Sequence, residues 1–293
     1  MAKAIWILHD QCNIENSALK TLEKDDFIFM VESKKDLDLK FTHKKKTAFI
    51  LSVNRHFSET LRSMYNQVVF MPLLKSDDLS QIQGLMKLTD QHHLSDVVLM
   101  LPKSYTHRQV INEIKHLNFT FTVDVNLISD ENIMLPWFKA KSFRMETFYQ
   151  KMRLQTNLLM DAYKQPLGGA FNFDKKNQNG LKIIPTPYKR RSFKKDEITL
   201  DAIQQVNQIF PHQLGDTQSF YFAINAKQAQ IECDHFIKYI LKDFGQYQDN
   251  MIADDAYIAH SLLSAYLNIG LLNPLKVCQQ VHDAAVAALK IIP

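Results

Sequence analysis

The sequence predicts an α/β domain, then a long connector, then an all-helical region. Three observations lead to this fold class. Up to about residue 125, short β-branched and aromatic runs alternate with amphipathic stretches of helical length. Between about residues 126 and 198 the alternation stops in a basic stretch rich in Lys, Asn and Pro. From residue 199 onward, apolar residues recur at helical spacing.

Five short apolar runs are expected to form the strands of a parallel sheet. They contain few charges and many Val, Ile and Phe residues, as strands buried on both faces do. Capping residues precede or begin the amphipathic stretches: Ser76-Asp77-Asp78 precedes one, and Thr106 can cap another. The alternation predicts a doubly wound, five-stranded parallel sheet. The expected strands are 4–8, 27–31, 68–73, 97–101 and 119–125, and the expected helices are 44–64, 79–91 and 106–117.

The carboxyl ends of such strands are where an α/β sheet binds ligands. The G-x-G-x-x-G dinucleotide fingerprint is absent, because residues 8–13 are Leu-His-Asp-Gln-Cys-Asn. Asp10 after the first strand, and Glu32 and Asp36 after the second, are the polar groups expected at this edge. For each of them, capping a helix or facing solvent is an equally good interpretation.

The connector and the helical region follow. A helical pattern over residues 145–160 ends before Pro166-Leu167-Gly168-Gly169, and a Lys/Asn/Pro-rich stretch then runs to Lys195. Loops of this length are usually functional or disordered. Helices are expected at 200–210, 226–244, 256–269 and 274–291, and the predicted domains are 1–126, 127–198 and 199–293.

The net charge of +4 is unevenly distributed along the chain. Residues 131–200 carry fourteen Lys and Arg against six Asp and Glu, so this segment has a charge of +8 and the remainder −4. One basic segment on a slightly acidic body predicts a local surface that faces a polyanion.

The composition argues against several other classes of protein. Cys12, Cys233 and Cys278 are widely spaced and odd in number, so we expect neither a disulfide framework nor a self-contained metal site. The His92-His93 pair and His107 show no ligand spacing, and we expect them to be surface histidines. The apolar runs are too short to span a bilayer and the N-terminus lacks the apolar core of a signal peptide. We therefore expect a cytoplasmic, monomeric protein that does not associate with membranes.

Several segments, in the same order along the chain, resemble one protein family. Each segment alone is weak, but the ordered set covers nearly the whole chain. On this basis the chain resembles the deoxyribodipyrimidine photolyase-related proteins, which include the prokaryotic (6-4) photolyases and related bacterial cryptochromes. The segments are Leu8-His9-Asp10-Gln11, with His9 where Gly is usual; residues 43–57, with Asn54 where Met is usual; the connector segments 148–153, 158–160 and 168–174; and the helical segments 244–249 and 260–272.

The resemblance implies two chromophores. It implies an N-terminal antenna domain carrying a 6,7-dimethyl-8-ribityllumazine-type pigment, with Asp10, Glu32 and Asp36 as candidate contacts. Asp36 is shorter than the Glu that is common in the family. The resemblance also implies that residues 199–293 are the first part of a helical FAD-binding domain. The residues expected at the FAD phosphates are His260, Ser261, Leu263, Ser264 and Tyr247.

The FAD assignment depends on residues 260–264, which are similar to the T-S-x-L-S element of the wider superfamily, with His260 in place of Thr. Two hydroxyls and the N–H groups of a helix start suit a diphosphate. The alternative is an ordinary helix start capped by serine. Tyr247 is equally well explained as a core aromatic residue.

The resemblance also places the connector against DNA, so UV-damaged DNA is the expected partner. Lys and Arg gain affinity for DNA by releasing its counterions. A basic linker without a partner is the alternative. The run Lys44-Lys45-Lys46 is instead expected to be a solvated helix face. The candidate DNA contacts are Arg144, Lys151, Arg153, Arg190 and Arg191.

The resemblance implies a reaction in which reduced FAD donates an electron, in light, to a (6-4) or cyclobutane pyrimidine photoproduct. This is a carbon–carbon lyase reaction. Family members continue further, with an active-site histidine and four cysteines that bind a 4Fe-4S cluster, so we expect no catalytic residue and no cluster ligand within these 293 residues. Whether this chain is itself an enzyme stays open. The alternatives are a cryptochrome-type blue-light photoreceptor without repair, and an inactive, truncated chromophore- or DNA-binding module.

Overall fold

The computed structural model describes residues 2–39, 41–76, 78–139, 144–173, 188, 190–253 and 255–290. The chain divides into two compact units. The α/β unit comprises Met1–Asn126, Arg191–Ala229 and Tyr266–Leu272. The helical unit comprises Leu127–Arg190, Gln230–Ala265 and Asn273–Pro293. The expected domain limits at residues 126 and 198 stay predictions.

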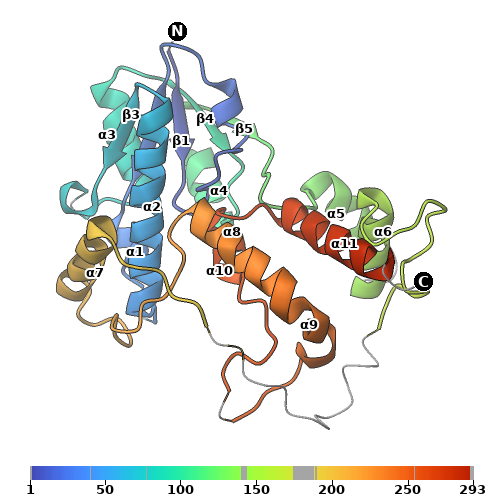
Figure 1. Cartoon of the computed structure of the whole chain (residues 1–293). Helices are drawn as coiled ribbons and strands as arrows, with labels where there is room; N and C mark the ends of the chain where they lie inside the picture. The colour runs from blue at the N-terminus through green and yellow to red at the C-terminus, as the bar shows by residue number, and fades with distance from the viewer. Residues whose placement is uncertain are drawn as a thin grey trace. The chain divides into compact units, whose positions relative to one another are not determined.

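Five parallel strands form the sheet of the α/β unit, in the order β3-β2-β1-β4-β5 (Figure 1). Ala4 pairs with Phe27 on one side and with Val97 on the other, so β1 lies at the centre. The chain changes direction across the sheet between β1 and β4, which makes that edge a topological switch point. The predicted fold class is confirmed. The strands are β1 (Ala4–Ile7), β2 (Phe27–Val31), β3 (Val68–Met71), β4 (Asp96–Met100) and β5 (Asn118–Thr122).

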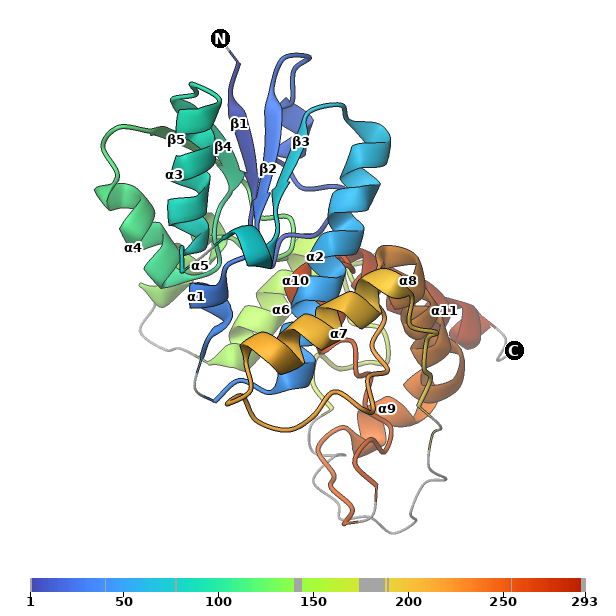
Figure 2. The same cartoon turned by 90° about the vertical axis from the view of Figure 1, so that its left-hand side faces the viewer.

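Helices cover both faces of this sheet because successive strand residues point to opposite sides. Trp6, Phe29 and Leu99 share a fully buried cluster with residues of α3 (Gln81–Gln91) and α4 (Tyr105–Glu113). Figure 2 shows α3 and α2 (Lys44–Met64) on opposite sides of the sheet. The short helix α1 (Lys34–Leu37) and two single 3-10 turns, Leu19–Thr21 and Leu73–Lys75, complete the connections.

Capping residues fix where these helices begin. The His43 Nδ1 atom accepts a hydrogen bond from the Lys45 N–H at 3.0 Å and caps α2. Ser80 caps α3 in a capping box with Gln83. Ser104, not Thr106 as expected, caps α4, because its hydroxyl oxygen accepts from the His107 N–H at 3.3 Å.

The first helix expected in the helical region packs instead within the α/β unit. This helix, α7 (Glu197–Ile209), lies against α2. Its N-cap Asp196 accepts hydrogen bonds from the Thr199 N–H at 2.9 Å and from His56 of α2 at 2.7 Å. The helix is therefore anchored at its start to the α/β unit.

The helical unit is built mainly from α5 (Glu131–Phe138), α6 (Met145–Thr156), α9 (Leu241–Tyr247) and α11 (Pro274–Lys290). The expected helix at 226–244 is present as α8 (Ala226–His235), a π-helical turn (Phe236–Ile240) and α9. The expected helix at 256–269 is wrong over its first half, because only α10 (Ser264–Ile269) is helical. Left-handed backbone at Ile258 (φ 39°) and Leu262 (φ 55°) prevents an earlier start.

In the part of the chain that the structure describes, no helix has both the length and the apolar character needed to cross a bilayer.

Candidate functional site

The carboxyl edge of the parallel sheet gathers polar side chains at the switch point between β1 and β4. Three of them form a connected chain. The Asp36 carboxylate accepts from the Gln81 N–H at 2.7 Å, and the Gln81 side-chain oxygen accepts from the His9 N–H at 3.3 Å. The Gln81 amide also contacts the His9 ring. Segments after β1 and β2 are thus fixed to the start of α3.

His107 of α4 faces this chain. Its ring centroid lies 6.4 Å from that of His9, in an edge-to-face arrangement. Burial lowers the pKa of His107, and the nearby His9 acts in the same direction, while Asp36 and Asp10 partly oppose them. His107 is therefore a half-buried member of the site and less exposed than expected.

The lowered pKa of His107 predicts an acid-sensitive fold. In the unfolded chain, His107 takes up a proton below about pH 6.5, whereas in the folded chain its lowered pKa keeps it neutral to a lower pH. The unfolded state therefore binds more protons between these two pKa values, and the free energy of unfolding should fall as the pH is lowered through that range. Urea unfolding of wild type and His107→Gln, measured between about pH 7.5 and 5, checks this. The variant should show a flatter profile. His116→Gln, at an exposed position, is the control, and an equal flattening in that variant would contradict the assignment.

A second group lies after β4 and β5. Lys103 Nζ donates to the carbonyl oxygens of Asp10 at 3.3 Å and Asn268 at 2.7 Å. Asp124 is buried; one of its carboxylate oxygens accepts from the Asn126 N–H at 2.9 Å, and the other has no protein partner in the described chain. Burial raises the pKa of Asp124.

Asn126 repeats this pattern. Its side-chain oxygen accepts from Asn13 at 2.9 Å, whereas its buried side-chain nitrogen has no partner among the described residues. Buried polar atoms nearly always have hydrogen-bond partners. An unsatisfied acceptor on Asp124 and an unsatisfied donor on Asn126 therefore suit a polar ligand at this edge.

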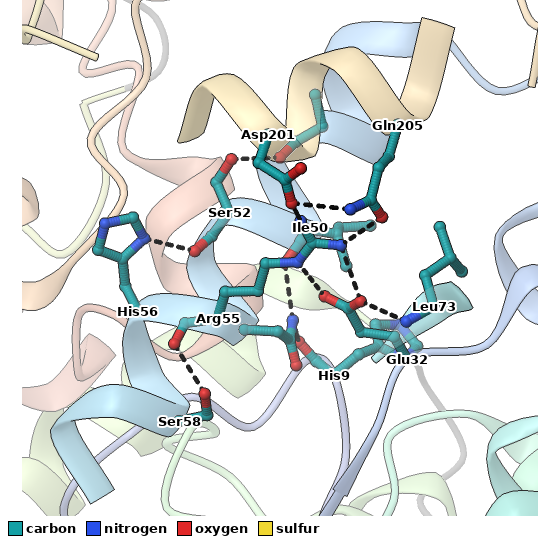
Figure 3. A network of polar contacts seen from close by, with 12 residues as sticks. His9, Glu32, Ile50, Ser52, Arg55, His56, Ser58, Leu73, Asp201 and Gln205 are labelled. Atoms are coloured by element: carbon teal, nitrogen blue, oxygen red, sulfur yellow. Dashed lines mark hydrogen bonds and ion pairs between the residues drawn. The ribbon is translucent and has the colours of Figure 1, made fainter. Parts of the chain in front are cut away.

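Glu32, the third residue expected at this edge, is engaged elsewhere (Figure 3). Arg55 of α2 donates to both of its carboxylate oxygens, at 2.8 and 3.0 Å, and the Leu73 N–H donates to one of them at 2.8 Å. Arg55 also reaches Asp201 at 2.7 Å and Gln205 at 2.9 Å, both on α7. Burial raises the pKa of Glu32, and the bonds from Arg55 act against this shift. The structure thus brings Asp10 and Asp36 close to His107 and places Glu32 in a separate ion-pair network.

The residues expected at the FAD phosphates lie in the helical unit. Tyr247 and Leu263 are buried, His260 and Ser261 are half-buried, and Ser264 is exposed at the first residue of α10. In the described chain neither serine hydroxyl makes a hydrogen bond to another protein group. Leu262, between these two serines, has a left-handed backbone conformation (φ 55°). This conformation is uncommon for a bulky side chain, and such strained residues cluster at ligand sites. Two free hydroxyls beside a strained residue fit a phosphate group.

The expected DNA contacts divide by exposure. Arg144, at the N-cap of α6, and Lys151, seven residues later on the same helix, are exposed. Arg191 is exposed, and Arg190 is half-buried with its guanidinium 5.0 Å from the Tyr257 ring. Arg153 is buried and donates to the carbonyl oxygens of Leu158, Leu159 and Phe171. It therefore holds the turn after α6, and we leave it out of the DNA contacts proposed below.

The thiols do not fit an iron–sulfur cluster. Among the described residues no group of three or more His, Cys, Asp or Glu side chains is placed to hold a metal ion. Burial raises the pKa of Cys12 and Cys278 and raises that of Cys233 to about 11. A 4Fe-4S cluster needs thiolates at several converging positions, so these residues supply no such site.

Sequence reasoning missed several residues of the sheet edge: His9, Gln81, Lys103, Asp124 and Asn126. Asp124 and Asn126 follow the fifth strand, so examining the residues after every strand would have found them. Gln81 could not be found in this way, because it reaches the site from the start of α3.

Comparisons with known proteins bear on this site. The family model described as deoxyribodipyrimidine photo-lyase-related protein matches residues 5–222. A (6-4) photolyase of Agrobacterium fabrum is 33% identical over 293 residues, which cover 97% of this chain and 57% of that protein. The chain thus spans a little more than half the length of this curated relative.

Proposed function

We propose a light-dependent, flavin-based role on DNA for this chain, which belongs to the deoxyribodipyrimidine photo-lyase-related family. The observation that carries the proposal is the family match across residues 5–222. In the complete protein, the proposed reaction is repair of (6-4) or cyclobutane pyrimidine photoproducts. When bound in its reduced form, FAD supplies the electron that initiates this reaction in light.

The FAD diphosphate is proposed to lie at residues 260–264. The hydroxyls of Ser261 and Ser264 would donate to phosphate oxygens, and His260 would add a third donor. Buried Leu263 would hold this segment in the helical unit. Tyr247, at the end of α9, is proposed as a further contact, although its burial also suits a core role.

Removing both hydroxyls should weaken flavin binding. Hydrogen bonds to charged groups contribute about 1.5–3 kcal/mol each, so we expect Ser261→Ala/Ser264→Ala to raise the Kd for FAD at least about ten-fold. Equilibrium titration followed by flavin fluorescence measures the change. Ser219→Ala, at an exposed position of the α/β unit, is the matched control. An unchanged Kd in the double variant would remove the phosphate assignment.

Arg144, Lys151, Arg190 and Arg191 are each proposed to contact DNA. Arg144 is the N-cap residue directly before α6, and Lys151 lies seven residues later within the helix. Both are exposed, as phosphate contacts must be.

Reversing the charges of Arg144 and Lys151 should weaken DNA binding in a salt-dependent way. Each phosphate contact contributes about 0.9 to the slope of log K against log salt for duplex DNA, so Arg144→Glu/Lys151→Glu should lower that slope by about 2. Fluorescence anisotropy with a duplex, over a range of salt concentrations, measures it. Lys44→Glu/Lys46→Glu, in the run expected to face solvent, is the charge-matched control and should change the slope less.

The antenna pigment is proposed to lie at the carboxyl edge of the sheet. Asp10 and Asp36 are the predicted contacts there, and the unsatisfied atoms of Asp124 and Asn126 suit the acceptors and donors of a lumazine ring and its ribityl hydroxyls. Glu32 is less suited to a pigment contact because both its oxygens already accept hydrogen bonds.

A photoreceptor without repair would use the same chromophores. Lesion turnover therefore separates the two functions: irradiation of the complete, flavin-loaded protein with lesion-containing DNA should restore the pyrimidines. A light response with no turnover would favour the photoreceptor. A cytoplasmic monomer remains the expectation.

A further inference from the structure

A hollow of about 500 Å³ lies in the helical unit, and none of its described lining residues belongs to residues 260–264 or to α6. Among the residues that the structure describes, its lining contains no acidic side chain and consists of Tyr188, His235, Lys238, Tyr239 and Lys242. Lys238 has no carboxylate within ion-pair distance in the described chain. The hollow is thus cationic and aromatic.

The backbone that presents these residues is unusual. His235 ends α8, and Lys238 and Tyr239 lie in the π-helical turn Phe236–Ile240. Single π-turns inside α-helices occur often at functional sites. The wider turn places Lys238 Nζ 5.0 Å from the Tyr239 ring centroid and the His235 ring 5.0 Å from the same ring. Tyr239 is therefore oriented by two neighbours while 47% of its surface stays exposed.

Tyr188 is oriented by Asp243 of α9. Its hydroxyl donates to the Asp243 carboxylate at 2.5 Å. Burial and this carboxylate raise the pKa of Tyr188 to about 12, so the hydroxyl stays protonated and keeps donating. Asp243 also lies 3.9 Å from Lys242 Nζ, so its charge partly offsets that lysine. The acid holds the aromatic ring and still leaves the hollow with a net positive charge.

We propose that this hollow binds a nucleotide unit of single-stranded DNA. Lys238 and Lys242 would contact the phosphate, and Tyr239 and Tyr188 would stack on the base. Grooves that bind single strands combine these two features, because the lysines follow the backbone and every base has a face to stack. An acidic peptide would use the charges and leave the rings without a role. The inference rests on the proposed DNA function and adds a site outside the connector.

The test uses the full chain and a labelled oligothymidylate of about twelve nucleotides, within the ~4–16 that such sites cover. A duplex of the same length, thymidine 5′-monophosphate, inorganic phosphate and an oligoglutamate peptide serve as competitors. Tyr239→Ala should weaken single-strand binding about five-fold or more, whereas Tyr239→Phe, which keeps the ring, should stay within about two-fold of wild type. Lys238→Ala/Lys242→Ala should lower the salt slope by about 1.4.

Lys227→Ala, an exposed lysine in the first turn of α8, is the matched control. Thymidine 5′-monophosphate should compete better than inorganic phosphate if a base stacks in the hollow. The proposal is overturned if Tyr239→Ala binds like wild type, if Lys227→Ala loses as much affinity as the double lysine variant, or if the oligoglutamate peptide competes as well as the nucleotide. If instead the proposed duplex contacts of the connector are wrong, the results differ. Substituting Arg144 and Lys151 then leaves duplex binding unchanged, while single-strand binding still depends on Lys238 and Tyr239.

Discussion

Replacing Arg55 by alanine should lower the free energy of unfolding by about 3–5 kcal/mol, because the change leaves the Glu32 carboxylate buried without its counter-charge. Glu32 is only 4% exposed and accepts two hydrogen bonds from Arg55. Arg55 also joins α2 to α7 through Asp201 and Gln205, so the loss should loosen the packing of α7. Urea unfolding at neutral pH, followed by tryptophan fluorescence, measures the change.

Two comparisons isolate the buried charge as the cause. Arg62→Ala removes an exposed cation paired with Glu59 on the same helix and should cost less than about 1 kcal/mol. The deficit of Arg55→Ala should also shrink as the pH falls, because a buried carboxylate without its partner has a raised pKa and takes up a proton that relieves the cost. A deficit that stays constant down to about pH 4, near the ordinary Glu pKa, would contradict this explanation.

Truncating Trp6 should have an effect of similar size for a different reason. Trp6 is fully buried at the centre of the sheet, in the cluster that contains Phe29 and Leu99. Trp6→Ala should therefore cost about 3–5 kcal/mol through lost apolar burial and the cavity left behind. Thermal or urea unfolding followed by circular dichroism measures it, because the substitution removes a fluorescent residue.

Trp6→Phe is the matched comparison. The Trp6 indole N–H is buried and has no hydrogen-bond partner in the described chain, so removing it relieves an unsatisfied donor. Phenylalanine keeps most of the apolar contact and should cost much less than alanine. Equal losses in the two variants would contradict a cost that comes from lost apolar contact and a cavity.

The fold class could be predicted because each of its signals is local. The strands β1 and β2 are uninterrupted apolar runs, β4 is apolar from Val97 onward, and the helices between the strands have clear periodicity and caps. The helix expected at 256–269 does not begin at residue 256, because the Asp255 carboxylate accepts hydrogen bonds from the N–H groups of Tyr257 and Ile258 and forms a turn there. Apolar periodicity does not reveal such a side-chain hydrogen bond. The packing of α7 on α2 could not be predicted either, because it depends on contacts between residues far apart in the chain, such as Arg55 and Asp201.

The site was only partly predictable for a related reason. Asp10 and Asp36 could be named because acidic residues that follow a strand within a few positions are visible in the sequence. Glu32 shares that pattern, yet Arg55 binds both its oxygens, and an ion pair between the end of a strand and a distant helix leaves no sequence signal. Arg153 resembled a DNA contact by charge alone, whereas its burial against three carbonyl oxygens gives it a structural role.

The measurement that tests the central proposal most directly is the absorption spectrum of the purified full chain, before and after incubation with FAD and 6,7-dimethyl-8-ribityllumazine. The proposal predicts a bound chromophore with absorption in the blue after excess ligand is removed. It further predicts that Asp36→Ala lowers retention of the lumazine and Ser261→Ala/Ser264→Ala lowers retention of the flavin. A folded chain that retains neither chromophore after reconstitution would contradict it.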